Sequence, residues 1–238
     1  MRWSSALIPL RDINPTERFA IVTLLLIILN CIIFFYQTTL GQAAEEHFIA
    51  SFALIPKHFF SYTGLMHNEL PVSATILTSM FLHGGFFHIA GNMLYLWIFG
   101  NNIEDAMGRM RFIIFYLVCG FVAAYAHAYM NSSSITPMIG ASGVISGILG
   151  AYLLLYPRAR VVTLFIIVFY IRTIPVPAMV VLLFWILLQF LNALGASNSA
   201  EGVAWYAHLA GFITGMILIG VFKRRDVPFG GGGRLSYP

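Results

Sequence analysis

The sequence predicts an all-α membrane protein, a bundle of six transmembrane helices with both termini in the cytoplasm. Of its 238 residues, 59% are hydrophobic and only 9% are charged, whereas a soluble domain carries about 25% charged residues. The apolar residues form six segments of spanning or near-spanning length, and the basic residues lie almost entirely on one side of these segments. Together these observations exclude a soluble globular domain.

We expect one helix in each apolar segment: Phe19–Tyr36, Thr78–Gly100, Phe112–Met130, Ser142–Tyr156, Pro177–Ala193 and Ala204–Phe222. A helix needs about 20 residues to cross a hydrocarbon core about 30 Å thick, so the fourth segment is short. The stretch Asn131–Gly140 must therefore descend into the membrane to reach it. Irregular backbone at that depth is tolerated where it is buried in protein or lines a water-filled cavity. We predict a cavity that opens to the outer side, with Ser142 at its floor.

The basic residues fix the expected orientation, because cytoplasmic segments of membrane proteins are enriched in Lys and Arg. With the N-terminus inside, the outer segments hold only Lys57, and the inner segments hold the other twelve of the 13 Lys and Arg residues. The net charge of +4 is then a topology signal rather than a nucleic-acid footprint. We divide the chain into a cytoplasmic segment 1–18, a six-span domain 19–222 with an outer loop 37–77, and a flexible basic, Gly-rich tail 223–238.

Two features between and beside the spans need separate interpretations. Val161–Ile171 is apolar but short and is bracketed by Arg160 and Arg172, so we expect it to lie in the membrane interface. Glu104 and Asp105 are followed closely by Arg109 and Arg111, which predicts an ion-pair cluster at the turn into the third span.

Polar residues within apolar spans are costly and by default mark function. Ser142 opens the fourth span and His208 lies near the start of the sixth. At 1.5 Å per residue, each lies about 21 Å above the inner boundary. A serine hydroxyl is a weak nucleophile that needs a neighbouring base, and a neutral histidine can supply one. We interpret Ser142 as nucleophile and His208 as general base; the alternatives are a helix-capping serine and a structural buried histidine.

Two stripes of small residues support this pairing. Gly143, Gly147 and Ala151 recur every four residues on the fourth span, and Ala207, Gly211 and Gly215 do so on the sixth. Such stripes let helix backbones approach closely in lipid. Ser142 and His208 adjoin the first member of each stripe, so packing the stripes together would bring them within reach.

The second span adds His83, His88 and Asn92. His88 and Asn92 are four residues apart and share a helix face, so we expect them to stabilise an oxyanion together with the Ser142 backbone N–H. A metal site built from His83, His88 and His208 is the alternative, but no carboxylate lies at this depth to support it. No acidic residue is placed to complete a triad either. We predict a Ser–His dyad that uses no metal and no cofactor.

These residues resemble the rhomboid family of intramembrane serine proteases. The matching motifs are Phe81-Leu82-His83-Gly84-Gly85 with His88 and Asn92, Gly100 with Glu104 and Gly108-Arg109, Gly140-Ala141-Ser142-Gly143, and Ala207-His208-Leu209-Ala210-Gly211. The resemblance implies Ser142 as nucleophile, His208 as base, His88 and Asn92 at the oxyanion, and cleavage of single-span membrane proteins near the outer end of their helix. It also implies sideways entry of substrate at the fifth span, near Phe184 and Trp185.

The chain departs from the family pattern at two places. Many members carry an aromatic residue one turn after the nucleophile, where this chain has Ser146. Another group must then orient the His208 ring, with Tyr206 and Tyr152 as candidates. The Trp-Arg pair of the first outer loop is also absent from this chain.

The sequence leaves rival functions open. One is a catalytically inactive rhomboid-like protein that binds membrane clients, and another is a transporter with a histidine proton relay, which the lack of intramembrane carboxylates disfavours. We expect single-span membrane proteins and lipids as partners, no nucleic acid, and residence in a bacterial cytoplasmic membrane with the site open to the outer side. The sequence does not indicate the oligomeric state.

Overall fold

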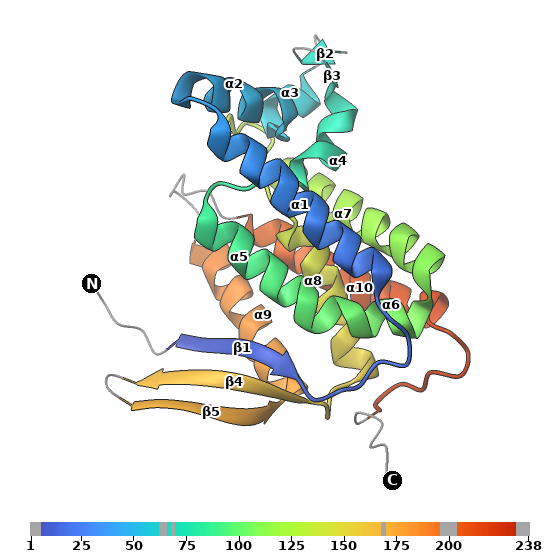
Figure 1. Cartoon of the computed structure of the whole chain (residues 1–238). Helices are drawn as coiled ribbons and strands as arrows, with labels where there is room; N and C mark the ends of the chain where they lie inside the picture. The colour runs from blue at the N-terminus through green and yellow to red at the C-terminus, as the bar shows by residue number, and fades with distance from the viewer. Residues whose placement is uncertain (1–5, 62–65, 68–69, 168–169, 196–203, 232–238) are drawn as a thin grey trace.

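The structure is a computed structural model that describes residues 6–61, 66–67, 70–167, 170–195 and 204–231. It is a helix bundle with a small sheet at one side (Figure 1). The α-helices are α1 (Ile21–Thr39), α2 (Gln42–Phe52), α3 (Pro56–Phe60), α4 (Thr75–Ser79), α5 (Phe86–Tyr95), α6 (Asn101–Met107), α7 (Arg109–Met130), α8 (Ser142–Leu155), α9 (Ala178–Gly195) and α10 (Trp205–Phe222). The predicted N-terminal segment and C-terminal tail lie partly outside these described residues.

Four of the described helices are long and apolar enough to cross a membrane, namely α1, α7, α9 and α10. They match the first, third, fifth and sixth predicted spans. The fourth, α8, is a shorter apolar helix of 14 residues, as expected. The structure thus supports a mostly helical membrane protein with four candidate spans, and the count of six remains a prediction.

The second predicted span is displaced along the chain. Residues 81–85 are not helical, and the helix runs from Phe86 through α5, a π-helical turn η2 (Leu96–Gly100) and α6 to Met107. The prediction of a start at Thr78 was therefore wrong. The adjacent glycines Gly84 and Gly85 explain the late start, because glycine is a poor helix former.

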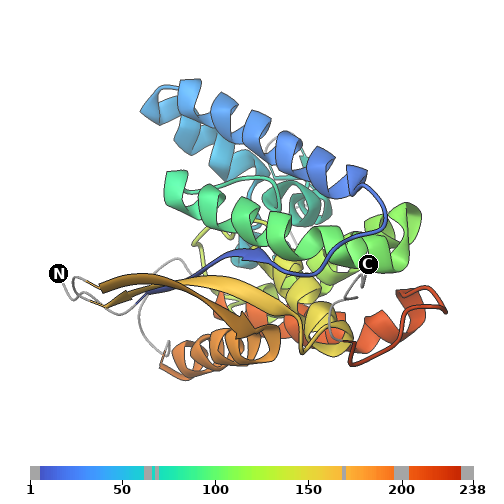
Figure 2. The same ribbon diagram turned by 60° about the horizontal axis from the view of Figure 1, so that its bottom comes forward.

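The prediction of an all-α fold was also incomplete. A three-stranded antiparallel sheet has the order β1 (Ala6–Asp12), β4 (Arg160–Ile167) and β5 (Tyr170–Pro177). Residues 161–167 and 170–171 of the segment Val161–Ile171 belong to the β4–β5 hairpin, in which Arg160 pairs with Pro177. The β-branched residues of this segment favour strand. The expected place of this segment in the membrane interface remains a prediction. Figure 2 shows this sheet extending away from the bundle beside α9.

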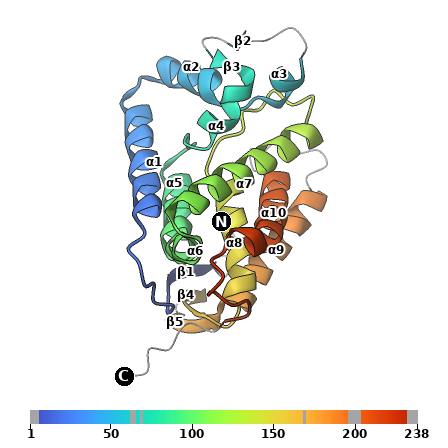
Figure 3. The ribbon, with the colours of Figure 1, turned by 90° about the vertical axis from the view of Figure 1, so that its right-hand side faces the viewer.

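Shorter elements lie at the end of the molecule opposite the β1–β4–β5 sheet (Figure 3). Helices α2, α3 and α4 cluster there with the two-stranded sheet of β2 (Met66–His67) and β3 (Leu70–Pro71) and the 3₁₀ turn η1 (Val72–Ala74). The carbonyl of Met138 accepts the Leu54 backbone N–H at 3.3 Å, and the Leu54 carbonyl accepts the Met138 N–H at 2.8 Å. The outer loop is therefore tied to the stretch that leads into α8.

Helix α8 is the central element of the bundle. Every residue from Gly143 to Leu153 is buried, as expected for a helix that is apolar on all sides. Its two expected small-residue contacts with α10 are present: a Cβ on Gly211 would overlap the Gly143 carbonyl oxygen, and one on Gly215 would overlap that of Gly147. The two backbones therefore touch with no side chain between them.

Polar contacts fasten the end of the bundle at which α1 and α7 begin and α8 and α10 end, which we call the basic end. The Glu104 carboxylate accepts the backbone N–H groups of Val22 at 3.0 Å and Thr23 at 2.7 Å, and the Thr23 hydroxyl at 2.8 Å. It thus caps the N-terminus of α1. The expected cluster of Glu104 and Asp105 with Arg109 and Arg111 was wrong for the described residues. The Glu104 oxygens bond α1, and Asp105 accepts the Glu17 backbone N–H.

The sheet is joined to the bundle through Asp12. Its Oδ2 accepts the Tyr152 hydroxyl at 2.8 Å and the Asn102 side-chain amide at 2.7 Å. Burial raises the pKa of Asp12 to about 6, although both of these hydrogen bonds favour the charged form. The contact connects β1 with α8 and α6 at the basic end.

We expect Gly215→Ala to destabilise the protein, because the added methyl group must force α10 away from the Gly147 carbonyl. Overpacking of this kind costs about 1–3 kcal/mol. Gly220→Ala on the same helix is the matched control, since its Cβ meets nothing closer than 3.9 Å. Thermal unfolding in detergent measures both. Equal melting temperatures for the two variants would contradict the backbone contact.

Candidate active site

Ser142 and His208 meet in the structure. Ser142 is the first residue of α8, and His208 lies in the first turn of α10. The His208 Nε2 atom is 2.8 Å from the Ser142 Oγ atom, and the histidine is only 8% exposed. The predicted contact of these two side chains is therefore present in the structure. A hydroxyl hydrogen-bonded to an imidazole is the arrangement that activates a weak oxygen nucleophile.

A third residue, Gln189 of α9, holds the other side of the imidazole. Its Oε1 atom is 2.7 Å from His208 Nδ1, and its Nε2 atom donates to the Trp185 carbonyl at 3.3 Å. Because the amide N–H₂ is directed to that carbonyl, Oε1 is the atom left to accept the Nδ1–H of His208. The Nε2 atom of His208 then has a free lone pair directed at the Ser142 hydroxyl.

Sequence reasoning missed Gln189 because it searched for an acidic third member. The available signal was an amide side chain in an otherwise apolar helix, between Leu188 and Phe190. A polar group in such a segment is costly unless it has a partner. The only described partners of its amide are Trp185 and His208.

Two tryptophans flank the His208 ring and replace the aromatic residue that the family pattern led us to look for. The Trp185 ring centre lies 5.7 Å away with the planes tilted by 42°, and that of Trp205 lies 6.1 Å away, edge to face. Ser146 donates to the Ser142 carbonyl at 2.6 Å. The candidate Tyr152 is bonded to Asp12 instead, and the other candidate, Tyr206, makes no described ring contact with His208.

Two hydrogen-bond donors stand beside Gly140, two residues before Ser142. The Asn92 Nδ2 atom is buried and has no hydrogen-bond partner. The Gly84 backbone N–H donates weakly to His88 Nδ1 at 3.4 Å, so the ring proton of a neutral His88 is on Nε2. A buried donor without a partner requires an explanation. An oxyanion formed next to Ser142 would provide one.

Gly140 is required by this geometry. Its φ of +115° lies in a region that favours glycine. A Cβ there would also lie 2.7 Å from His88 Nε2. The Gly140 N–H donates to the Ser79 carbonyl at 2.8 Å, which fixes the turn into α8.

The remaining predicted site residues lie behind these groups. His83 is fully buried and packs edge to face on His88 at 5.1 Å between ring centres. Its backbone N–H and C=O both bond the Gln37 side chain of α1 at 3.2 Å. Gly143, Ala207 and Gly211 form the α8–α10 contact under the serine. These four residues therefore support the site rather than line it.

Ser142, His208, Gln189, His88 and Asn92 border one cavity of about 370 Å³ between α5 and α9. Its lining residues are Phe87, His88, Gly91, Asn92, Tyr95, Ile139, Ser142, Ile145, Trp185, Gln189, Ala204 and His208. Ile139 belongs to the stretch 131–140 that was predicted to line such a cavity. Within the described residues, no three His, Cys, Asp or Glu side chains come together in a way that could hold a metal ion.

Comparison with known proteins decides the family. A sequence model of the rhomboid domain matches residues 72–225, which is more than half of the chain and includes every residue that lines the cavity. The chain belongs to the rhomboid family. This rhomboid is 28% identical over 160 residues to Rhomboid protein 1, mitochondrial, of Saccharomyces cerevisiae, and the match covers 66% of this chain and 44% of the yeast protein.

Two other relatives are also similar to this rhomboid over only part of their length. RHOMBOID-like protein 1 of Arabidopsis thaliana is 30% identical over 65% of this rhomboid and 38% of the plant protein. Presenilin-associated rhomboid-like protein, mitochondrial, of Mus musculus is 32% identical over 40% of this rhomboid and 26% of the mouse protein. The chain thus spans less than half the length of these relatives. They are eukaryotic, and two are named mitochondrial, so they do not support the predicted bacterial membrane.

We expect a fluorophosphonate probe to label Ser142. Gln189→Leu should slow this labelling about 10- to 100-fold, because the His208 imidazole is then no longer held in the tautomer with its proton on Nδ1. Gln189→Glu keeps an acceptor at the same position and should label faster than Gln189→Leu. Labelling kinetics in detergent, with Ser142→Ala as the unlabelled control, measure the effect. Equal rates for wild type and Gln189→Leu would contradict the orienting contact.

Proposed function

We propose that this rhomboid is an intramembrane serine endopeptidase. The observation that carries the proposal is the continuous hydrogen-bond chain from Gln189 through His208 to Ser142, which ends at a cavity with an unpaired Asn92 donor. Membership of the family supports the proposed peptidase function, because rhomboids are generally intramembrane serine proteases. An inactive scaffold would have no need of a nucleophile, a base and a free donor at one point.

The proposed reaction follows from the positions of these groups. Ser142 Oγ attacks the carbonyl carbon of the scissile peptide bond while its proton passes to His208 Nε2. The tetrahedral oxyanion accepts hydrogen bonds from Asn92 Nδ2, His88 Nε2–H and the Ser142 backbone N–H. His208 then gives the proton to the leaving amine, and a water molecule activated in the same way hydrolyses the acyl-enzyme.

We propose single-span membrane proteins as substrates. The cavity lies between α5 and α9, and its rim includes Phe87, whose side chain is 89% exposed. Trp185 of α9 is at the same cavity. An unfolded stretch of a substrate helix could reach Ser142 from the lipid through this side, as the family resemblance implies.

The proposed topology has six spans, both termini in the cytoplasm and the cavity open to the outer side. The distribution of charge supports it. Arg18, Arg109, Arg111 and Arg224 lie at the basic end, while Lys57 lies on α3 at the other end. By the positive-inside rule, the basic end would face the cytoplasm.

We expect Ser142→Ala and His208→Ala each to abolish cleavage of a single-span substrate by the purified protein in proteoliposomes, because each removes a reacting group. Ser133→Ala, which changes an exposed serine in the loop before α8, is the control and should cleave as wild type does. Gel electrophoresis and mass spectrometry detect the products. A wild-type protein that binds but never cleaves a panel of such substrates would indicate an inactive client-binding protein instead.

We expect Asn92→Ala to lower kcat about 10²- to 10³-fold with little change in KM, because the lost donor acts mainly on the oxyanion. Asn192→Ala removes an exposed amide from α9 and should leave both constants unchanged. Initial rates at several substrate densities in the membrane separate the two constants. A rise in KM at constant kcat would assign Asn92 to substrate binding instead.

A further inference from the structure

A second cavity, of about 470 Å³, lies at the basic end and shares no lining residue with the active-site cavity. Its lining includes five arginines and, among the described residues, no acidic one: Arg18, Arg109, Arg111, Arg224 and Arg225, with Met107, Gly108 and Met110. These arginines come from three places in the chain, before α1, at the start of α7 and after α10. So many cations around one hollow suggest an anionic ligand.

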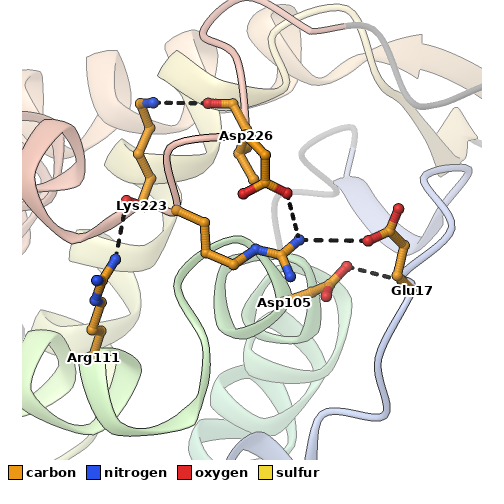
Figure 4. A network of polar contacts seen from close by, with 7 residues as sticks. Glu17, Asp105, Arg111, Lys223 and Asp226 are labelled. Atoms are coloured by element: carbon orange, nitrogen blue, oxygen red, sulfur yellow. Dashed lines mark hydrogen bonds and ion pairs between the residues drawn. The ribbon is translucent and has the colours of Figure 1, made fainter.

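The fold itself brings these segments together. The Arg224 backbone N–H donates to the Ala106 carbonyl at 2.8 Å, and Arg111 Nη1 donates to the Lys223 carbonyl at 3.4 Å (Figure 4). The segment after α10 is thereby held against the α6–α7 junction. The backbone segments around the cavity are therefore held in place, and exposed arginine side chains project from them into its lining.

Nearby carboxylates neutralise only part of this charge. Arg224 lies between Glu17 at 3.5 Å and Asp226 at 3.6 Å. Asp105 accepts the Glu17 backbone N–H at 2.9 Å. In the described part of the chain, no carboxylate lies within ion-pair distance of Arg109, Arg111 or Arg225, and all three are exposed.

The start of α7 adds a fourth source of positive potential. This 22-residue helix begins at Arg109 after Gly108, no side chain caps it, and no acidic residue occupies its first turn. Gly108 and Arg109 both line the cavity. The free N–H groups of a helix N-terminus attract phosphate and other anions, and here they adjoin the three arginines that have no ion-pair partner among the described residues.

The cavity lining also includes the apolar residue Met110, and apolar side chains are exposed further along α7. Met110 is 70% exposed and Ile114, one turn further, is 49% exposed. Phe19 is also exposed, in an adjoining hollow that shares Arg18, Gly108, Arg109 and Met110 with the cavity. Glu104 and Asp105 line that hollow but not the cavity itself. A ligand with a negative head and hydrocarbon tails matches both surfaces, whereas a free phosphate would use only the first.

We propose that this cavity binds the phosphodiester headgroup of an anionic phospholipid, with the acyl chains lying along α7. Basic pockets between transmembrane helices are suited to such headgroups. The ligand would join the starts of α1 and α7 to the end of α10. Binding requires no catalysis, so the proposal stands apart from the peptidase function, and Ser142→Ala should bind lipid as wild type does.

Titration of the whole detergent-solubilised protein with phosphatidylglycerol, with bound lipids counted by native mass spectrometry, tests the proposal. We expect one preferred site that phosphatidylcholine fills far less well and that excess inorganic phosphate does not empty. The variant Arg109→Gln/Arg111→Gln/Arg225→Gln should bind about 100-fold more weakly, while the control Arg11→Gln/Arg158→Gln/Arg160→Gln, with the same loss of charge at the sheet and the end of α8, should stay within about twofold of wild type.

Three results would overturn the proposal. Equal binding of phosphatidylcholine and phosphatidylglycerol would remove the need for an anion, and equal loss in the two triple variants would show that only overall charge matters. Displacement by inorganic phosphate would make the cavity a site for small phosphates instead of lipids. If the first triple variant fails to fold, wild type alone decides, because phosphatidylglycerol binding must weaken as salt rises.

Discussion

The close approach of α8 and α10 is the constraint on which the remaining structure depends. Gly143 and Gly147 present bare carbonyls to Gly211 and Gly215, so the two helices are separated only by main-chain atoms. Ser142 and His208 stand at the same end of this contact, and their 2.8 Å separation follows from it. In lipid, where the hydrophobic effect does not drive helix association, packing of this kind is the main source of stability. The site is thus assembled by the same contact that assembles the bundle.

The neighbouring helices divide the other tasks between them. Helix α9 supplies Gln189 and Trp185 to orient the histidine, and the stretch before α8 supplies Gly140, whose lack of a side chain leaves room for His88. At the basic end, Glu104 and Asp12 join α1 and the sheet to α6 and α8. Polar groups therefore occur where segments must be held in one relative position, and the apolar surface faces outward.

The sequence predicted the parts of this architecture that follow from simple periodicity. The four-residue stripes and the helical rise placed Ser142 opposite His208, because both helices are regular between these residues and the basic end. Two other features depend on information that a single sequence expresses weakly. The β4–β5 hairpin could not be told from an interfacial segment by hydropathy alone, since its pairing with β1 joins residues about 150 positions apart. Gln189 is a neutral residue whose role appears only when α9 lies beside α10.

The neutrality of Gln189 has a consequence for charge within the membrane. A carboxylate in its place would leave a permanent negative charge in a medium of low permittivity, where an isolated ion is costly. With an amide, the uncharged forms of serine, histidine and glutamine make a site with no net charge before a substrate arrives. In the proposed reaction, ionisation would occur only as an imidazolium and an oxyanion created together. Each ion would be the counter-ion of the other, and both would vanish when the proton moves on to the departing amine.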